Sequence, residues 1–196
     1  YIRVVDYKTG SKKFDLREVY YGLDCQMLLY LFTLERNGGH LFSQGTAAGV
    51  EYLWADPAPE NIIRPETDDA EPLQAQNYPL EGLLLDEPSI YHAMDTRGTG
   101  AFVPLRFSAK TGEPTAQSAK ARLADREKFN RIRDHLDGML TDMAKNLYSG
   151  EIDAAPLVPN AGKSPCLWCE YRTVCRHADG EGERTPLKPD DPFGAE

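Results

Sequence analysis

An acidic and a basic residue, Asp6 and Lys8, follow a short apolar run near the start of the chain, in the stretch IRVVDYKTG. Residues two apart on a β-strand point to the same face, so a strand here would hold the carboxylate beside the ammonium. A carboxylate can bind Mg²⁺, and an ammonium can orient a water or offset charge on a phosphoryl oxygen. The pattern suits hydrolysis of a phosphodiester. On these two residues alone, an ordinary surface ion pair is the simpler interpretation.

A glutamine and a tyrosine then share one face of the helix that we expect to follow. Gln26 and Tyr30 stand at i and i+4, among positions that are mostly Leu, Met and Phe. A glutamine amide in such surroundings is costly unless it has a partner. An active-site edge beside the strand would supply that partner, whereas a position at the rim of the helix would need none.

Three of the four cysteines cluster late in the chain, as Cys166, Cys169 and Cys175. Their C-x₂-C-x₅-C spacing indicates metal binding in a reducing compartment, because four cysteines are too few for a disulfide scaffold of this length. A [4Fe–4S] cluster needs four thiolates. Zinc held by these three and His177 is the rival, although the Cys–His spacing is shorter than zinc sites usually have. The fourth cysteine, Cys25, lies among apolar residues and is expected to be a core thiol.

Hydrophobic periodicity predicts the elements that must position these residues. We expect a strand at 2–5, a helix at 16–36 capped by Asp15, a strand at 47–55, a short helix at 88–95, a strand pair or irregular hairpin at 98–114 and a helix at 119–149 ended by Gly150. The chain then divides into a core at 1–56, an acidic insertion and strand pair at 57–118, the long helix and Cys-rich segment at 119–178, and a disordered tail at 179–196.

Charge is distributed unevenly along the 196 residues, whose net charge is −9. Residues 51–95 hold eleven acids and one base, so the rest of the chain is close to neutral. The basic residues in the first half of the long helix fit either a solvated face or a face toward nucleic acid. No apolar run is long enough to span a bilayer, and no phosphate loop of an ATPase is present.

Three motifs in this order resemble one nuclease family. The stretch VVDYKTG, the Gln-x-x-x-Tyr helix and CLWCEYRTVC are similar to the RecB-type branch of the PD-(D/E)xK nucleases, and within it to AddB-type nuclease domains. The resemblance extends to GLLLDEPSIYHAMD and LYSGEIDAAPL. It implies an α/β fold with a restriction-endonuclease-like mixed sheet flanked by helices. It also implies that this chain, which lacks an initiator Met, is truncated before the first helix and strands of that fold.

The resemblance assigns roles residue by residue. Asp6 is expected to be a Mg²⁺ ligand, the backbone carbonyl of Tyr7 a second ligand, and Lys8 the catalytic lysine. Gln26 and Tyr30 are expected to support the site or contact the DNA backbone. The family's other metal-binding carboxylate has no counterpart here, so we expect the fragment alone to be inactive.

The same resemblance implies cofactors, partners and a place of action. The cofactors would be Mg²⁺ and a [4Fe–4S] cluster on Cys166, Cys169 and Cys175, with its fourth cysteine upstream and absent. The partners would be DNA and an AddA-like helicase–nuclease subunit, in the bacterial cytoplasm, during processing of double-strand breaks for recombinational repair. Two alternatives remain: a smaller RecB-like nuclease of CRISPR adaptation, and a non-catalytic, metal-stapled module that binds DNA or a partner.

Overall fold

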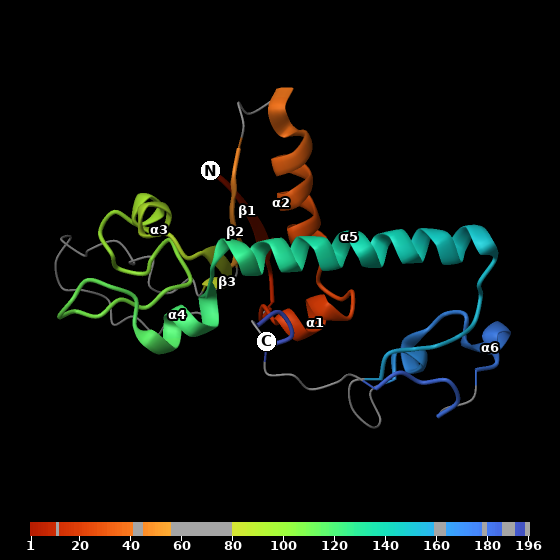
Figure 1. Ribbon diagram of the computed structural model, residues 1–196. Helices are drawn as coiled ribbons and strands as arrows, with labels where there is room; N and C mark the ends of the chain where they lie inside the picture. Colours follow the sequence, from red (N-terminus) through yellow and green to blue (C-terminus); the bar gives the residue numbers. More distant parts are fainter. Residues whose placement is uncertain are drawn as a thin grey trace, which may run out of the picture.

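The computed structural model describes residues 1–10, 12–40, 45–55, 80–158, 164–177, 180–185 and 191–194. Their elements, shown in Figure 1, are β1 (Ile2–Lys8), α1 (Leu16–Tyr20), α2 (Gln26–Asn37), η1 (Gly38–His40), β2 (Ala47–Trp54), β3 (Leu80–Leu85), α3 (Pro88–Met94), α4 (Ala116–Arg122), β4 (Leu123–Ala124), α5 (Arg126–Ser149), η3 (Pro165–Trp168) and α6 (Arg172–Cys175). No described helix is both long and apolar enough to cross a membrane. Residues 56–79, most of the acidic segment, lie outside the described residues.

The strands form one mixed sheet in the order β1-β2-β3-β4. β1 and β2 are parallel, β2 and β3 are antiparallel, and β3 and β4 are parallel. A parallel pair needs a crossover between its strands, and α1 and α2 supply it here. The expected α/β class with a mixed sheet flanked by helices is therefore confirmed, as are the expected strands at 2–5 and 47–55.

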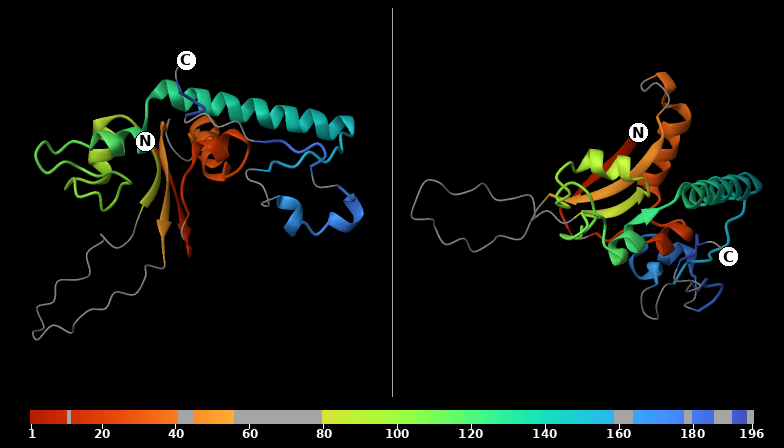
Figure 2. Two further views of the ribbon diagram at one scale, coloured as in Figure 1. Left: turned by 90° about the horizontal axis from the view of Figure 1, so that it is seen from below. Right: turned by 60° about the vertical axis from the view of Figure 1, so that its left-hand side comes forward.

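Apolar side chains cover both faces of the sheet. On one face, Val50, Leu83 and Leu85 pack with buried residues of α2 and α5. On the other face, Leu84 and Leu123 pack with Tyr91 of α3 and with the segment around Val103. Alternate residues of a strand point to opposite faces, which explains why neighbours such as Leu83 and Leu84 belong to different clusters. Figure 2 shows α1 on one side of the sheet and α3 on the other.

The single helix expected at 16–36 is wrong, because the chain breaks between α1 and α2. Asp15 caps α1 as expected, accepting a hydrogen bond from the backbone N–H of Arg17. Gly22 and Asp24 then take φ values of 84° and 53°, in the left-handed region that a helix cannot include. The Leu23 N–H donates to the Glu18 carbonyl across the turn, which is the C-terminal bond of a Schellman motif.

The long helix expected at 119–149 is also wrong at its start. Thr115 caps the short helix α4, and Leu123 and Ala124 then extend and pair with Leu84 and Leu85 of β3. Asp125 caps α5, which ends at Gly150 as expected, with the glycine at φ 77°. The short helix expected at 88–95 is confirmed as α3.

Residues 98–114 form no regular strand pair, but the irregular hairpin, the other expectation, is present at its C-terminal part, where Ser108 N–H donates to the Glu113 carbonyl. Within this stretch the structure has one isolated antiparallel bridge, between Phe107 and Pro114. The stretch is organised instead around buried Asp95, whose carboxylate accepts hydrogen bonds from the backbone N–H groups of Gly100 and Ala101. Closed loops of this kind use side-chain oxygens in place of a strand partner.

Part of the tail expected to be disordered is ordered against the core, which corrects that expectation for residues 191–194. Phe193 is 4% exposed and packs edge-on against Tyr20 and His135. The Lys128 ammonium lies 2.6 Å from the Asp191 carboxylate, and the Arg131 guanidinium donates to the Phe193 carbonyl. Figure 1 shows the last described residues, 191–194, beside α1. This stretch therefore contacts both α1 and α5.

Glu51 is the one strongly buried acid of β2, at 1% exposed. The guanidinium of Arg3 on β1 donates to its Oε2 at 3.0 Å and also to the Phe102 carbonyl. Its Oε1 has no hydrogen-bond partner among the described residues. Burial raises the pKa of Glu51 to about 7, and the Arg3 charge only partly offsets this.

We predict that Phe193→Ala lowers the free energy of unfolding by about 1.5–3 kcal/mol, the value of burying one large apolar side chain. Urea unfolding of the variant would measure this change. Phe102→Ala is the matched control, because Phe102 is 56% exposed and loses little burial. Equal stability of the Phe193 variant and the native chain would contradict the packing of residues 191–194.

We predict that stability falls as pH rises from about 4.5 to about 7, with Glu51 as one cause. In this window the folded chain holds a proton on Glu51 that the unfolded chain has lost, so rising pH favours unfolding. Glu51→Gln should flatten this part of the stability–pH curve. Glu127→Gln, at a side chain that is 83% exposed, should leave the slope unchanged.

Candidate functional site

Asp6 and Lys8 lie on the same face at the carboxyl end of β1. The Lys8 ammonium is 2.6 Å from the Asp6 carboxylate, and each side chain is about one third exposed (36% for Lys8 and 34% for Asp6). The pair therefore forms a charge-assisted contact that solvent or a substrate can still reach. Tyr7 points to the other face and is 69% exposed.

Two aromatic residues of β2 lie next to this pair. Tyr52 is the cross-strand neighbour of Asp6 and Trp54 that of Lys8. The Lys8 ammonium stands 5.3 Å from the centre of the Tyr52 ring, within cation–π range. Burial, and then the charges of Asp24 and Asp6, raise the pKa of Tyr52 to about 12, so the phenol stays neutral. The buried indole N–H of Trp54 has no acceptor among the described residues.

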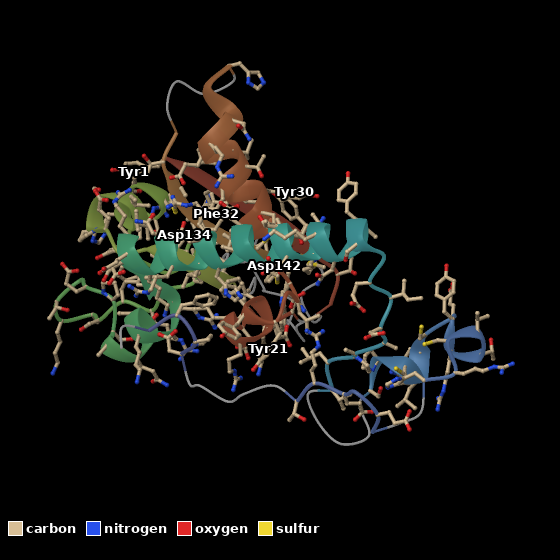
Figure 3. The ribbon with its side chains drawn as sticks, turned by 45° about the vertical axis from the view of Figure 1, so that its right-hand side comes forward. Tyr1, Tyr21, Tyr30, Phe32, Asp134 and Asp142 are labelled. Atoms are coloured by element: carbon tan, nitrogen blue, oxygen red, sulfur yellow. The ribbon has the colours of Figure 1, made fainter. Side chains whose placement is uncertain are left out.

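Gln26 and Tyr30 contact each other, as their spacing indicated. The Gln26 amide donates to the Tyr30 hydroxyl at 2.8 Å, on an exposed face of α2. Gln26 is the first residue of α2, and the crossover geometry brings that end of the helix back toward the end of β1. Figure 3 labels Tyr30 where α2 approaches α5. The amide thus has a partner of its own and still faces solvent.

A second charged cluster, which the motifs did not reveal, joins α1 to this end of the sheet. Lys12 forms ion pairs with Asp24 and, at 3.7 Å, with Glu18. A hydrogen bond with Asp24, followed by burial, raises the pKa of Glu18. Burial opposes ionisation of Asp24, but bonds from Glu18 and Lys12 and the charge of Lys8 lower its pKa. The left-handed turn at Asp24 brings the cluster together, and the Gly-Leu-Asp stretch after α1 was the available signal.

The basic residues of α5 are committed to partners within the chain. Arg126 pairs with Glu87, Lys128 with Asp191 and Arg133 with Glu35, at 3.8, 2.6 and 3.8 Å. Arg131 lies 3.9 Å from Glu127 on the same helix. Of the two interpretations of this helix, the pairing favours a solvated, ion-paired face over one that contacts nucleic acid.

Cys25 is the core thiol that its apolar surroundings predicted, and the other three cysteines lie on the C-terminal segment. Cys25 is buried, its thiol donates to the Leu23 carbonyl, and burial raises its pKa to about 11. Cys166 lies on η3 and is half-buried, whereas Cys169, just after η3, and Cys175, at the end of α6, are exposed free thiols. Within the described ranges, no three metal-ligating side chains gather closely enough to hold an ion.

The sequence is similar to several curated bacterial proteins that are each named as the B subunit of an ATP-dependent helicase/deoxyribonuclease. It is 31% identical over 183 residues to the protein of Exiguobacterium sibiricum, over 181 residues to that of Clostridium kluyveri and over 183 residues to that of Thermoanaerobacter sp. strain X514. Each match covers 90% of this chain. The chain spans only 15–16% of the length of these relatives.

The sequence model of the PD-(D/E)XK nuclease superfamily matches residues 1–176. That range contains the Asp6–Lys8 pair, the Gln26–Tyr30 pair and all four cysteines. The mixed sheet, with an Asp-x-Lys at the end of a strand and a helical crossover to its parallel neighbour, fits this match. The chain belongs to the PD-(D/E)XK nuclease superfamily.

Proposed function

We propose that this chain carries the Asp-x-Lys half of a Mg²⁺-dependent deoxyribonuclease site that hydrolyses DNA phosphodiesters. The observation that carries the proposal is the 2.6 Å contact between Asp6 and Lys8 at an accessible strand end. Membership of the nuclease superfamily supports the reaction class. The choice of DNA rests on the names of the relatives, which are deoxyribonuclease subunits.

The donors at this strand end fit Mg²⁺ in kind. Asp6 offers hard carboxylate oxygens and is partly exposed, so waters can complete the coordination shell. The Tyr7 carbonyl is the second ligand that we propose. The described residues hold no group of three metal-ligating side chains, which predicts weak binding of Mg²⁺ by this set alone. When bound, Mg²⁺ supplies Lewis-acid stabilisation and lowers the pKa of a bound water.

The chain's own residues have distinct roles in this proposal. Asp6 holds the metal and keeps the Lys8 ammonium at the strand end. Lys8 carries three N–H donors and a positive charge, which suit it to orient a water or to stabilise charge on a phosphoryl oxygen. The Tyr52 ring beneath Lys8 limits where the ammonium can move. Gln26 and Tyr30 hold each other in place and present an amide and a ring toward the DNA backbone.

We propose that the whole protein acts as one subunit of a helicase–nuclease with an AddA-like partner. Its role would be to process double-strand breaks for recombinational repair in the cytoplasm. The relatives' names favour this role over a small nuclease of CRISPR adaptation. A non-catalytic binding module would not need the accessible Asp6–Lys8 contact.

For Cys166, Cys169 and Cys175 we propose a metal centre, with [4Fe–4S] as the first choice. Their spacing supports it, and a cluster needs a fourth thiolate that Cys25 does not offer, since it bonds within the core. One observation favours the zinc alternative. The Nε2 atom of His177 is buried without a hydrogen-bond partner among the described residues, and a neutral imidazole nitrogen is a zinc ligand.

We predict that Lys8→Ala lowers Mg²⁺-dependent cleavage of linear duplex DNA by about 100-fold or more, because one preorganised charge-stabilising group is lost. Cleavage of an end-labelled duplex by the protein encoded by the full gene would measure this. Lys13→Ala is the matched control, since Lys13 is a nearby lysine without an ion pair among the described residues. The 196-residue chain alone should show no cleavage. Full activity of the Lys8 variant would refute the proposal.

We predict that the protein encoded by the full gene contains bound metal that depends on the three clustered cysteines. Iron and acid-labile sulfide, with a brown colour, would support the [4Fe–4S] centre, because it needs thiolate ligands. Cys169→Ser should then remove the iron, and Cys25→Ser should retain it. A colourless protein that contains zinc would refute the [4Fe–4S] centre and support the zinc site.

A further inference from the structure

An open cleft of about 470 Å³ lies outside the Asp6–Lys8 site, between the end of α3 and the turn at 107–112. His92, Thr96 and Arg97 line one side, and Phe107 and Ser108 line the other. The Phe107 ring is 5.9 Å from the His92 ring and 6.3 Å from that of Tyr91, which is buried beneath them. The cleft therefore joins an aromatic surface to hydroxyl and guanidinium groups.

The start of α3, the helix whose other end lines the cleft, and the Asp6–Lys8 pair lie at opposite ends of β1. The Tyr1 hydroxyl contacts Glu87, the residue that precedes α3, whereas Lys8 ends the strand. At about 3.3 Å of rise per residue, the two ends of β1 are about 20 Å apart. Phe107 also packs with the core cluster on the face of the sheet opposite Tyr52.

The charge around the cleft differs from that of the rest of the chain. Residues 95–122 hold five basic and two acidic residues, in a chain with net charge −9. One of the two acids, Asp95, is buried and bonded to backbone N–H groups, which leaves Glu113 as the exposed acid. Arg97 and Lys110 have no ion pair among the described residues, unlike the basic residues of α5. Unpaired cations are thus available at the cleft.

The wall that carries Arg97 is held in place by Asp95. Burial opposes ionisation of that carboxyl, but hydrogen bonds from the N–H groups of Gly100, Thr99 and Arg97 lower its pKa. The Thr99 hydroxyl adds a bond at 3.2 Å. The loop is therefore fixed by a charged anchor before any ligand arrives, which reduces the ordering cost of binding.

We propose that this cleft binds single-stranded DNA, with a base stacked on the Phe107 and His92 rings and a phosphate at Arg97. Partly exposed rings beside an unpaired cation are features that bind single strands without base-specific contacts. In a duplex the base faces are covered by stacking, so rings in a cleft do not reach them. The choice of DNA as the ligand rests on the proposed nuclease function.

The test measures binding of a fluorescein-labelled thymidine oligonucleotide to this chain by fluorescence anisotropy in EDTA. Without a divalent metal, the chain cannot hydrolyse the oligonucleotide at Asp6 and Lys8, so the anisotropy measures binding alone. Phe107→Leu should weaken binding by about fivefold or more, because a stacked base loses its ring. Phe107→Tyr keeps the ring and should retain binding. Arg97→Gln should weaken binding and reduce the slope of log K against log salt by about 0.7, the loss of one phosphate contact.

Two variants at the far end of α5 serve as matched controls. Tyr148→Leu removes a ring that is 93% exposed, and Lys145→Gln removes a lysine whose side chain is 71% exposed. Both should bind the oligonucleotide like the native chain. Thymidine monophosphate should compete at lower concentration than inorganic phosphate, since it offers a base as well as an anion.

Four outcomes would overturn the proposal. The first is native-like binding by Arg97→Gln and Phe107→Leu, and the second is a loss of binding in the α5 controls equal to that in the cleft variants. The third is an affinity for a blunt duplex equal to that for the single strand. The fourth is equal competition by inorganic phosphate and thymidine monophosphate. If Lys8→Ala abolishes cleavage but the cleft variants bind like the native chain, the nuclease function is supported and the cleft proposal is refuted. If the cleft variants specifically lose oligonucleotide binding but the protein never cleaves DNA, the cleft proposal is supported and the nuclease function is refuted.

Discussion

The parallel pairing of β1 with β2 is the constraint on which the rest of the structure depends. It requires a crossover, and α1 and α2 form that crossover over one face of the sheet. The pairing sets Asp6 against Tyr52 and Lys8 against Trp54, and the Lys8 ammonium lies over the Tyr52 ring. It also returns the first residue of α2, Gln26, to the same end. A shift of one residue in this register would turn Asp6 and Lys8 to the opposite face.

The carboxylates on the two faces of the β1–β2 pair differ in how completely basic partners compensate them. On the face of Asp6 and Lys8, carboxylates of Asp6 and Asp24 have lysines as close partners. On the other face, Glu51 has the guanidinium of Arg3 but leaves one oxygen unbonded among the described residues, and its raised pKa reflects that incomplete compensation. Unsatisfied polar atoms of this kind are rare in folded proteins. The Trp54 indole N–H is another such atom, and Trp54 is the cross-strand neighbour of Lys8 in the proposed nuclease site.

The basic residues divide into those held in ion pairs within the chain and those without an ion pair among the described residues. The basic residues of α5 tie that helix to α2, to the residue before α3 and to residues 191–194. Arg97, which lines the aromatic cleft, and Lys110, in the turn at 107–112, lack such partners among the described residues. From the sequence, the basic residues in the first half of the long helix fitted either a solvated face or a face toward nucleic acid. Because the α5 cations are held in ion pairs, the cations available to bind an anion are those in the loops after α3.

Local signals in the sequence determined the helix caps at Asp15 and Gly150, the strand at 47–54, the helix after Pro88 and the shared face of Gln26 and Tyr30. Each depends on residues within a few positions of one another. The motifs likewise determined the family. Only the tertiary structure decided that Leu123 and Ala124 leave the helical pattern, because they pair with β3 some 40 residues earlier. It alone buried Phe193 between α1 and α5, joined Lys12, Glu18 and Asp24, and raised the pKa of Glu51. These features depend on contacts between distant segments, whose energy no local pattern of residues records.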